Sequence, residues 1–246
     1  MRMNHLKPLL SMVFPVHNEV STIENVLLAY YKRIASKIPL EIIVAEDGSI
    51  DGTRQVLLSL RNRIPIKLCL GNDRKGYAKA VGDALKHANG DWIFFSDSDG
   101  QYRSLDFWTL WKKREDYDMV IGWKVRRTES PYRIFLQKGF HAIVKSLFGV
   151  GMHDIDCGFR LMRNEVVRKV IDEVNHLEYS FWAEFTIHAF SKGFRIGEAP
   201  ISHNKRAHGS THIYGMTKIP WIVLKEVIGL RNLRSRSDGS TLRQPR

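Results

Sequence analysis

The chain has 246 residues, which suits one large α/β domain or two small ones. Its hydrophobic content of 43%, with 18 glycines and 8 prolines, describes a globular protein with a sizeable core and excludes a disordered chain. Two cysteines are too few for a disulfide framework and are ordinary for a reducing compartment. The formal net charge of +12 fits a nucleic acid, an anionic membrane face or a phosphorylated substrate as partner, with simple solubility as the plainer explanation.

The N-terminal apolar stretch, residues 9–16, is too short for a signal peptide and ends in polar residues. No apolar run reaches the roughly 18–20 residues that a membrane-spanning helix needs. We therefore expect a cytoplasmic protein that is either soluble or bound at the face of a membrane.

The first hundred residues alternate between short apolar strands and amphipathic helices. The expected strands are residues 10–16, 41–45, 66–70 and 92–95, and the expected helices are residues 21–36, 53–62 and 75–88. A capping box at residues 21–24 marks the start of the first helix. This alternation predicts βαβ units and a mainly parallel sheet, an α/β fold of the nucleotide-binding type.

After Gln101 the pattern is less regular. Helices are expected at residues 105–114, 134–148 and 181–191, strands at 119–122 and 194–199, and polar basic loops at 124–133 and 203–210. Residues 213–233 mix apolar and basic side chains, which predicts an amphipathic surface helix broken near Pro220. A basic tail follows it.

Two carboxylates follow the fourth expected strand directly. Asp97 and Asp99 alternate with serine and meet Gly100, so the chain must leave the sheet there. In open α/β sheets, ligands bind in the crevice beyond the carboxyl ends of the strands. Paired carboxylates at such a position suit Mg²⁺ or Mn²⁺, which keep phosphate oxygens among their other ligands. Acidic pairs also cap turns and helices, so this spacing by itself is a weak signal for a metal–diphosphate site.

Three stretches in this order resemble the signature stretches of family 2 glycosyltransferases with the GT-A fold. They are residues 15–19 (PVHNE), 46–53 (EDGSIDGT) and 97–101 (DSDGQ). Residues 156–160 (DCGFR), with Arg206, Gly209 and Ser210, resemble the polyprenyl-phosphate branch, which includes dolichol-phosphate mannosyltransferase and undecaprenyl-phosphate glucosyltransferases. The resemblance implies a three-layer α/β/α sandwich around a mainly parallel sheet. It gives a GT-A domain at residues 1–212 and a C-terminal amphipathic helix and basic tail at 213–246.

The same resemblance implies a site for a UDP- or GDP-hexose donor. Residues 15–19 and Asp47 would hold the base and ribose, and Asp97 and Asp99, helped by Gln101, would bind the metal and the diphosphate. We also assign the start of the third helix to this site. The donor site then comprises Pro15, Val16, Asn18, Glu19, Asp47, Gly48, Ser49, Lys75, Gly76, Asp97 and Ser98.

For the acceptor, the resemblance implies a lipid phosphate held by basic residues. Lys124 takes the position of a basic residue that follows a strand in the relatives, and Arg133 and Arg206 match two further phosphate-binding arginines. The relatives usually have a serine four residues after the first arginine, where this chain has Gln137, which still donates a hydrogen bond. The implied acceptor site comprises Lys124, Arg133, Gln137, Arg206 and Ser210.

Two transfer chemistries remain open from the residues. A phosphate acceptor is already anionic and attacks without a strong base, whereas a sugar hydroxyl needs a carboxylate such as Glu184 or Asp156. We assign catalytic roles to Asp99, Glu184 and Asp156, and attack opposite the leaving group would invert the anomeric centre. A non-catalytic nucleic-acid-binding protein is disfavoured because it leaves the acidic pair unexplained. The expected partners are a nucleotide sugar, a polyprenyl phosphate and an anionic membrane surface, with a second copy or a separate anchor protein left open.

Overall fold

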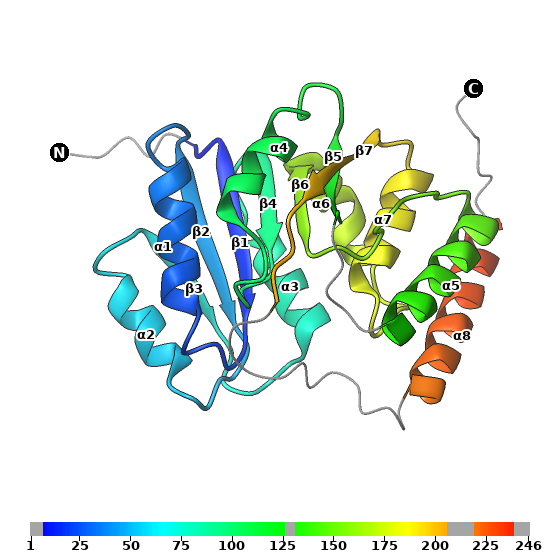
Figure 1. Cartoon of the computed structure of the whole chain (residues 1–246), viewed down its shortest axis with the longest axis horizontal. Coiled ribbons are helices and arrows are strands. Elements are labelled where there is room, and N and C mark those ends of the chain that lie inside the picture. Colours follow the sequence, from blue (N-terminus) through cyan, green and yellow to red (C-terminus); the bar gives the residue numbers. More distant parts are fainter. Residues whose placement is uncertain (1–6, 126–130, 206–218, 239–246) are drawn as a thin grey trace.

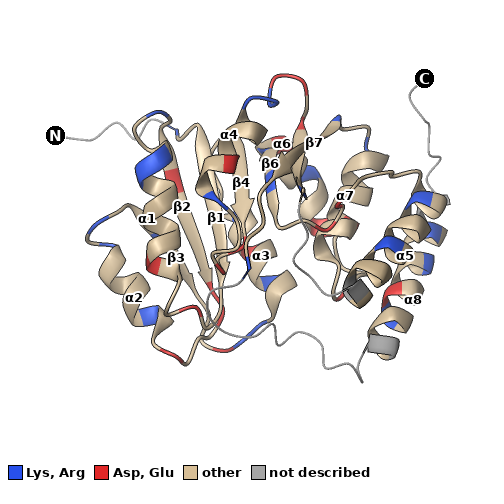
Figure 2. Ribbon diagram, in the orientation of Figure 1, with Lys and Arg blue, Asp and Glu red and all other residues tan. Residues whose placement is uncertain are grey.

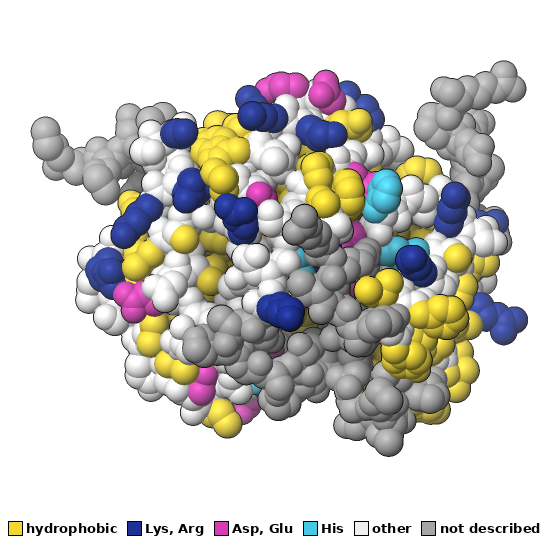
Figure 3. Space-filling view, viewed as in Figure 1, with side chains coloured by type: hydrophobic (Ala, Val, Ile, Leu, Met, Phe, Trp, Pro, Cys, Tyr) yellow, Lys and Arg dark blue, Asp and Glu magenta, His cyan; other side chains and the backbone are white. Residues whose placement is uncertain are grey.

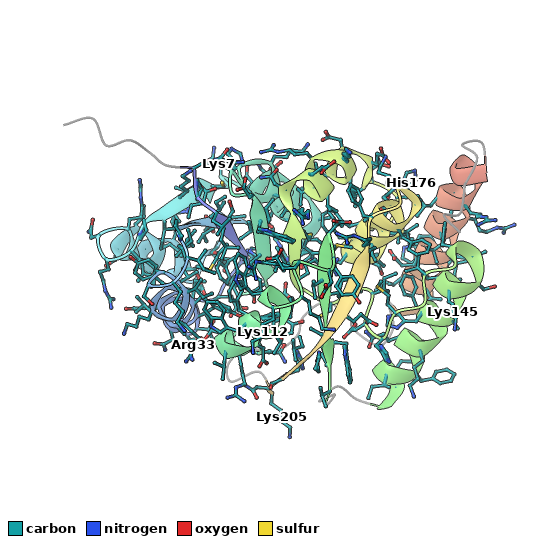
Figure 4. All side chains as sticks on the ribbon, turned by 90° about the horizontal axis from the view of Figure 1, so that it is seen from above. Lys7, Arg33, Lys112, Lys145, His176 and Lys205 are labelled. Carbon is teal, nitrogen blue, oxygen red and sulfur yellow. The ribbon has the colours of Figure 1, made fainter. Side chains whose placement is uncertain are left out.

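The computed structural model describes residues 7–125, 131–205 and 219–238. Within them seven strands form one sheet in the order β3-β2-β1-β4-β6-β5-β7. Helices cover both faces of this sheet, with α1 and α4 on one side and α3 and α6 on the other (Figures 1 and 4). The predicted three-layer α/β/α architecture is confirmed.

The element bounds follow the sequence pattern closely in the first half of the chain. The strands are β1 Leu10–Val16, β2 Leu40–Glu46, β3 Ile66–Leu70, β4 Trp92–Ser96, β5 Met119–Lys124, β6 Phe159–Arg163 and β7 Ile196–Ile201. The helices are α1 Ile23–Ile34, α2 Thr53–Leu60, α3 Tyr77–Lys86, α4 Phe107–Trp111, α5 Pro131–Phe148, α6 Asn164–Val170, α7 Phe181–Ser191 and α8 Ile219–Asp238. Two 3₁₀ turns, η1 Ser104–Asp106 and η2 Ile171–Glu173, complete the order.

The central strand β1 is buried along its whole length and pairs in parallel with β2 and β4. Its pairing with β4 ends at Val13, whereas its pairing with β2 continues to Val16. Pro15, which cannot donate a backbone hydrogen bond, lies in the stretch where only one neighbour is paired. Beyond Val13, β1 and β4 no longer pair through their backbones, at the edge where the three signature stretches emerge.

The antiparallel strand β6 is inserted between β4 and β5 and runs against both. The strands expected from the sequence after Gln101, at residues 119–122 and 194–199, do not include it. β5 and β7 pair in parallel, so the rest of the sheet keeps one direction. The sheet is mainly parallel, as predicted.

The expected capping box at the start of α1 does not form. Thr22 occupies the N-cap position without a side-chain cap hydrogen bond. Its hydroxyl instead donates to the carboxylate of Glu19 at 2.7 Å, while Glu24 forms an ion pair with Arg63. Thr22 therefore binds the first signature stretch and Glu24 binds a residue just after α2, so neither side chain caps the first turn of the helix.

A second, smaller core joins α5, α7 and α8 at one end of the sheet (Figure 1). Pro220 lies in the first turn of α8, where its missing N–H costs nothing, so it begins the helix rather than breaking it. No helix in the described ranges is long and apolar enough to cross a membrane. The buried members of this core are Val144, Val150, Ile155, Leu177, Ala183, Ile187, Leu230 and Leu233.

Candidate active site

The three signature stretches meet at one edge of the sheet. β2, β1 and β4 are adjacent and parallel, so their carboxyl ends lie side by side. Residues 15–19 close β1, residues 46–53 follow β2 and residues 97–101 follow β4. This is the edge at which open α/β sheets bind ligands.

Asn18 ties the first stretch to the second. Its backbone N–H donates to Oγ of Ser49 at 3.0 Å, and its side-chain oxygen accepts the N–H of Ile50 at 2.9 Å. Asn18 has φ of 54°, a conformation that asparagine adopts more readily than most residues. Next to it, the N–H of Glu19 donates to Oγ1 of Thr53 at 2.8 Å. The predicted donor residues of these stretches thus form one cross-linked loop pair.

Asp47 ties the second stretch to the start of α3. Its buried carboxylate accepts the N–H groups of Lys75 and Gly76 at 2.6 and 3.0 Å. Gly48 has φ of +66°, and a Cβ there would lie 2.7 Å from a backbone nitrogen of the turn before α3, so this close approach requires glycine. Lys75 contributes its backbone to this junction, while its ammonium group pairs with Asp83 at 3.0 Å.

Asp97 is held from two sides. Its backbone N–H donates to the carbonyl of Gly158 at 3.1 Å, and its Oδ1 accepts the hydroxyl of Tyr77 at 2.9 Å. The Tyr77 oxygen in turn accepts Nε1–H of Trp182 at 3.0 Å. Burial, reinforced by the charge of Asp99, raises the pKa of Asp97 to about 7. A half-buried carboxylate pair whose ionisation is opposed in this way favours a bound cation.

Asp99 and its neighbours shape the turn after β4. Oδ1 of Asp99 accepts the N–H of Gln101 at 3.0 Å, and the hydroxyl of Ser98 donates to the carbonyl of Pro15 at 2.6 Å. The side-chain amide of Gln101 donates to the carbonyl of Asn204 at 3.0 Å. Ser98 and Gln101 therefore position backbone, and the carboxylates of Asp97 and Asp99 are the hard oxygen ligands that fit Mg²⁺ or Mn²⁺.

Arg160 places a buried positive charge beside this site. It is fully buried, its guanidinium donates to the carbonyl of Cys157 at 2.6 and 3.0 Å, and it lies 4.0 Å from the ring centre of Trp182. Burial lowers the pKa of Arg160 to about 10, so it stays charged at neutral pH. Its charge lowers the pKa values of Asp97 and Asp156, and so offsets part of their desolvation.

Asp156 precedes β6 in the chain and contacts the start of α7, where its Oδ1 accepts the N–H of Ala183 at 3.1 Å. Burial raises the pKa of Asp156 to about 7, although Arg160 acts in the opposite direction. A carboxylate with a pKa near neutrality is well matched to accept a proton from a substrate hydroxyl.

Among the predicted acceptor residues whose side chains the structure describes, Lys124 has a charge that acts on Asp97. It ends β5, is half-buried, and lowers the pKa of Asp97. The side-chain amide of Gln137 donates to Oδ1 of Asp154 at 2.9 Å, so this donor makes a hydrogen bond within the protein. Three further predicted groups lie outside the described residues: the side chain of Arg133, and the residues Arg206 and Ser210.

Glu184 binds the loop before α7. Its oxygens accept the backbone N–H groups of Asn175, His176 and Leu177 at 2.7–2.9 Å, and Nδ1 of His176 lies 2.7 Å from Oε1. Burial opposes ionisation, but these backbone donors and the nearby His188, whose Nε2 lies 3.7 Å from Oε1, outweigh it and lower the pKa of Glu184 to about 2. A carboxylate so firmly ionised is a poor proton acceptor, so the geometry does not favour the catalytic role predicted for it.

Four residues of the site escaped the sequence prediction. Tyr77 and Trp182 contact the site through single polar atoms, and no local pattern marks them. Arg160 belongs to the motif at residues 156–160 (DCGFR), and this motif is the signal that could have placed it in the site. Arg54 donates to the buried carboxylate of Glu46 at 2.6 and 2.9 Å and so supports the second stretch from α2.

A hollow of about 800 Å³ lies at the opposite, amino-terminal end of the sheet, and is larger than the one of about 250 Å³ beside the second stretch. It is lined by several basic side chains, but these already have partners. Lys7 pairs with Asp91, Lys169 pairs with Glu165 at 2.6 Å, and Arg168 donates to backbone carbonyls. We therefore place the active site at the edge formed by the carboxyl ends of β2, β1 and β4, although the hollow there is smaller than the one at the opposite end of the sheet.

Solved structures share this fold at low sequence identity. A glucosyl-3-phosphoglycerate synthase from Mycobacterium tuberculosis, in complex with UDP, matches with a TM-score of 0.71 and 18% identity over 93% of this chain and 80% of that one. The mannosyltransferase PcManGT from Pyrobaculum calidifontis, in complex with GDP-Man and Mn²⁺, matches with a TM-score of 0.63 and 17% identity over 94% of this chain and 65% of that one. These likenesses confirm the predicted GT-A fold.

Sequence relatives agree with the branch that the later motifs predict. The dolichyl-phosphate beta-glucosyltransferase ALG5C of Trichomonas vaginalis is 30% identical over 227 residues, covering 84% of this chain and 67% of that protein. Glycosyltransferase AglD of Haloferax volcanii is 26% identical over 230 residues, covering 89% of this chain but only 35% of that protein. The model of the family described as glycosyl transferase family 2 matches residues 11–171. With its three signature stretches joined at one sheet edge, this chain belongs to glycosyl transferase family 2.

Proposed function

We propose that this transferase moves a hexose from a UDP or GDP sugar to a polyprenyl phosphate, with inversion, at the cytoplasmic face of a membrane. The observation that carries the proposal is the acidic pair Asp97 and Asp99 at the carboxyl edge of the sheet, with the positive charges of Lys124 and Arg160 near enough to lower the pKa of Asp97. This arrangement serves a reaction between two anions. Two relatives from Trichomonas vaginalis, 30% and 28% identical, are named dolichyl-phosphate beta-glucosyltransferases, which supports the acceptor class.

On the donor side, Asp97 and Asp99 would hold Mg²⁺ or Mn²⁺. The ion would neutralise the negative charge that develops on the departing diphosphate. The cross-linked loops at residues 15–19 and 46–49 would fix the base and ribose, because their backbone groups are already held in place by each other. The donor would thus lie along the ends of β2, β1 and β4.

On the acceptor side, a phosphate monoester has a second pKa of about 6, so it is largely dianionic at neutral pH. One of its oxygens forms a bond to the anomeric carbon as the bond from that carbon to the diphosphate breaks, and the nucleoside diphosphate leaves with both electrons. No proton has to be removed from the acceptor. Lys124 would attract and orient the phosphate, with Arg133 and Arg206 proposed for the same role.

A hydroxyl acceptor on a glycan is the second candidate, because Asp156 has a pKa of about 7. In that reaction Asp156 would take the hydroxyl proton as the new glycosidic bond forms. Glu184 is not suited to this step, since its oxygens are occupied by backbone donors. The two candidates therefore differ in their dependence on Asp156.

The outer surface of α5 and α8, which we call the α5–α8 face, fits the membrane surface. Its apolar side chains gather at the right of the molecule (Figure 3), and Lys and Arg residues are spread along both helices (Figure 2). Apolar side chains flanked by cations bind anionic lipid surfaces. The exposed apolar residues of this face are Tyr132, Phe135, Ile143, Trp221, Val223, Leu224 and Ile228, and its exposed cations include Lys138, Lys145 and Arg231.

A transfer assay tests the proposal. The protein, Mn²⁺ or Mg²⁺ and a short prenyl phosphate are incubated with UDP-glucose, UDP-GlcNAc, UDP-galactose or GDP-mannose, and the lipid fraction is analysed by mass spectrometry. We expect a hexosyl-phosphoprenol with one donor, lost in Asp99→Ala and retained in Asp116→Asn, which alters an exposed carboxylate in the turn after α4. Donor hydrolysis without a lipid product, abolished by Asp156→Asn, would favour the hydroxyl acceptor. Absence of metal-dependent turnover with every donor would overturn both candidates.

A further inference from the structure

We infer that Tyr77 and Trp182 are positioning residues that orient the Asp97 carboxylate for the metal-bound donor, through the chain of hydrogen bonds from Trp182 Nε1 to Tyr77 Oη to Asp97 Oδ1. This inference rests on the proposed function and adds two residues to its site. The three side chains come from the start of α7, the start of α3 and the end of β4. The distances along the chain are 3.0 and 2.9 Å.

The direction of this hydrogen-bond chain follows from its chemistry. The indole Nε1–H of Trp182 donates and cannot accept, so the Tyr77 oxygen must be its acceptor. The single hydroxyl proton of Tyr77 is then left for Asp97. Both hydrogen bonds therefore point toward the carboxylate, which is the arrangement that stabilises and orients a negative charge.

Trp182 is itself fixed by packing. It is 2% exposed, its ring centre lies 4.5 Å from that of Phe95 on β4, and the guanidinium of Arg160 covers it at 4.0 Å. Tyr77, in contrast, is 45% exposed although its hydroxyl lies between Trp182 and Asp97. The tyrosine ring therefore lies at the mouth of the site, with its polar end inward.

The other side of the carboxylate is also confined. An added Cβ on Gly158 would lie 2.6 Å from Cγ of Asp97, so Asp97 fits between Gly158 and Tyr77. In this arrangement Tyr77 contacts Asp97 and does not have to bind the metal itself. The pair acts on the cation through Asp97, as the outer partners of metal ligands do in other proteins.

The turn that begins α3 donates hydrogen bonds to both Asp47 and Asp97. Gly76 donates its N–H to Asp47, and the next residue, Tyr77, donates its hydroxyl to Asp97. Gly76 has φ of 90°, which glycine adopts without strain and which sets the direction in which α3 starts. One short turn thus links the predicted ribose-binding and metal-binding carboxylates.

Binding of Mn²⁺ alone, followed by electron paramagnetic resonance, tests this inference without requiring turnover. In Tyr77→Phe we expect Mn²⁺ affinity to fall by about tenfold or more, a size typical of lost outer-shell hydrogen bonds to metal ligands. In the transfer assay the apparent affinity for Mn²⁺ should weaken equally, while the KM for prenyl phosphate stays within about twofold of the wild type. Trp182→Phe should act in the same direction, and Tyr31→Phe and Trp108→Phe are the matched controls outside the site.

Thermal melting separates positioning from folding. Tyr77→Phe keeps the ring and should keep the melting temperature within about 2 °C of the wild type. Mn²⁺ affinity of Tyr77→Phe within about twofold of the wild type would overturn the inference and leave the proposed function standing. A wild-type protein that binds Mn²⁺ no more tightly than Asp99→Ala would overturn both.

Discussion

Gly158 lies directly against the carboxylate of Asp97, although 60 residues separate them in the sequence. The two meet because β6 runs antiparallel beside β4, with Phe159 paired to Ser96. This pairing places Gly158, which precedes Phe159, opposite Asp97, which follows Ser96. The Gly158 carbonyl accepts the N–H of Asp97 at 3.1 Å, and an added Cβ would lie 2.6 and 2.9 Å from Cγ and Oδ1 of the carboxylate. The antiparallel strand thus provides the space that the Asp97 side chain, the proposed metal ligand, occupies.

Replacing this glycine should displace the carboxylate. In Gly158→Ala we expect transfer to fall by about 100-fold or more, because misplacement of a reacting group by about 1 Å costs that much. Mn²⁺ binding measured on the same protein should weaken in parallel. Gly139→Ala in α5 is the control: a Cβ there meets nothing within 4 Å, so activity should be retained and stability should rise slightly. Wild-type transfer by Gly158→Ala would show that Asp97 tolerates another position.

Glu184 should prove structural rather than catalytic. In Glu184→Gln an amide NH₂ faces backbone N–H donors, so we expect the free energy of unfolding to fall by about 2–3 kcal/mol, the size of a charged hydrogen-bond network. The folded pKa of about 2 lies below the ordinary 4.5, so the carboxylate stabilises the protein above pH 4.5 and this contribution disappears as the pH falls toward 2. Urea unfolding at pH 7 and at pH 3 measures both effects. Glu165→Gln, at an exposed pair with Lys169, should cost less than about 0.5 kcal/mol.

If folded Glu184→Gln, kept well below its melting temperature, still transfers sugar at a rate within about threefold of the wild type, the structural role is supported. A stable variant without activity would restore Glu184 to the catalytic set. Asp99→Ala should show the reverse pattern, with normal stability and no transfer.

Asp156 should make the metal-free protein less stable as the pH rises. Its folded pKa of about 7 lies above the ordinary 3.8, so between these values the folded state binds more protons than the unfolded state. Stability therefore falls from about pH 4 to about pH 7 and is level above it. Asp97, whose pKa is also about 7, contributes in the same direction. Melting temperatures in chelator-treated buffer should fall from pH 5 to pH 8, and the fall should be smaller by about 2 °C or more in Asp156→Asn. An unchanged slope in that variant would contradict the raised pKa.

The sheet from β1 to β4 could be predicted because each of these strands is an apolar run closed by polar residues, which after β2, β3 and β4 include glycine and aspartate. β6 was missed because Phe159–Arg163 contains two arginines and resembles a polar segment. Arg160 is nevertheless fully buried, since carbonyls of its own turn accept its guanidinium. Such compensation depends on the tertiary structure and leaves no local periodicity.

The residues of the site divide in the same way, into those that a local sequence pattern marks and those that only the tertiary structure brings together. The residues of the three signature stretches could be named because they sit together in short segments at strand ends. Tyr77 and Trp182 could not, since they lie 20 and 85 residues from Asp97 in the chain and act through one polar atom each. Glu184 was assigned a catalytic role from its residue type on a helix, whereas its hydrogen bonds depend on the path of the loop at residues 175–177, which the sequence does not reveal.

The α5–α8 face should bind anionic bilayers through its exposed aromatic residues. Phe135 and Trp221 are 72% and 60% exposed, and burying such a side chain is worth about 1.5–3 kcal/mol. We therefore expect Phe135→Ser and Trp221→Ser each to weaken binding to vesicles rich in phosphatidylserine by about tenfold or more, with little change in the melting temperature. Vesicle flotation measures this binding.

Leu58→Ser on α2 is the matched control, because Leu58 is 43% exposed on a helix at the other end of the sheet. It should bind vesicles like the wild type. Binding should also weaken as salt rises, since the exposed Lys138, Lys145 and Arg231 would attract lipid headgroups through charges that salt screens. Transfer to a water-soluble short prenyl phosphate should be unaffected by Phe135→Ser, whereas transfer to a long prenyl phosphate in vesicles should fall with the binding. Equal loss on both acceptors would place the α5–α8 face in the acceptor site itself rather than on the membrane.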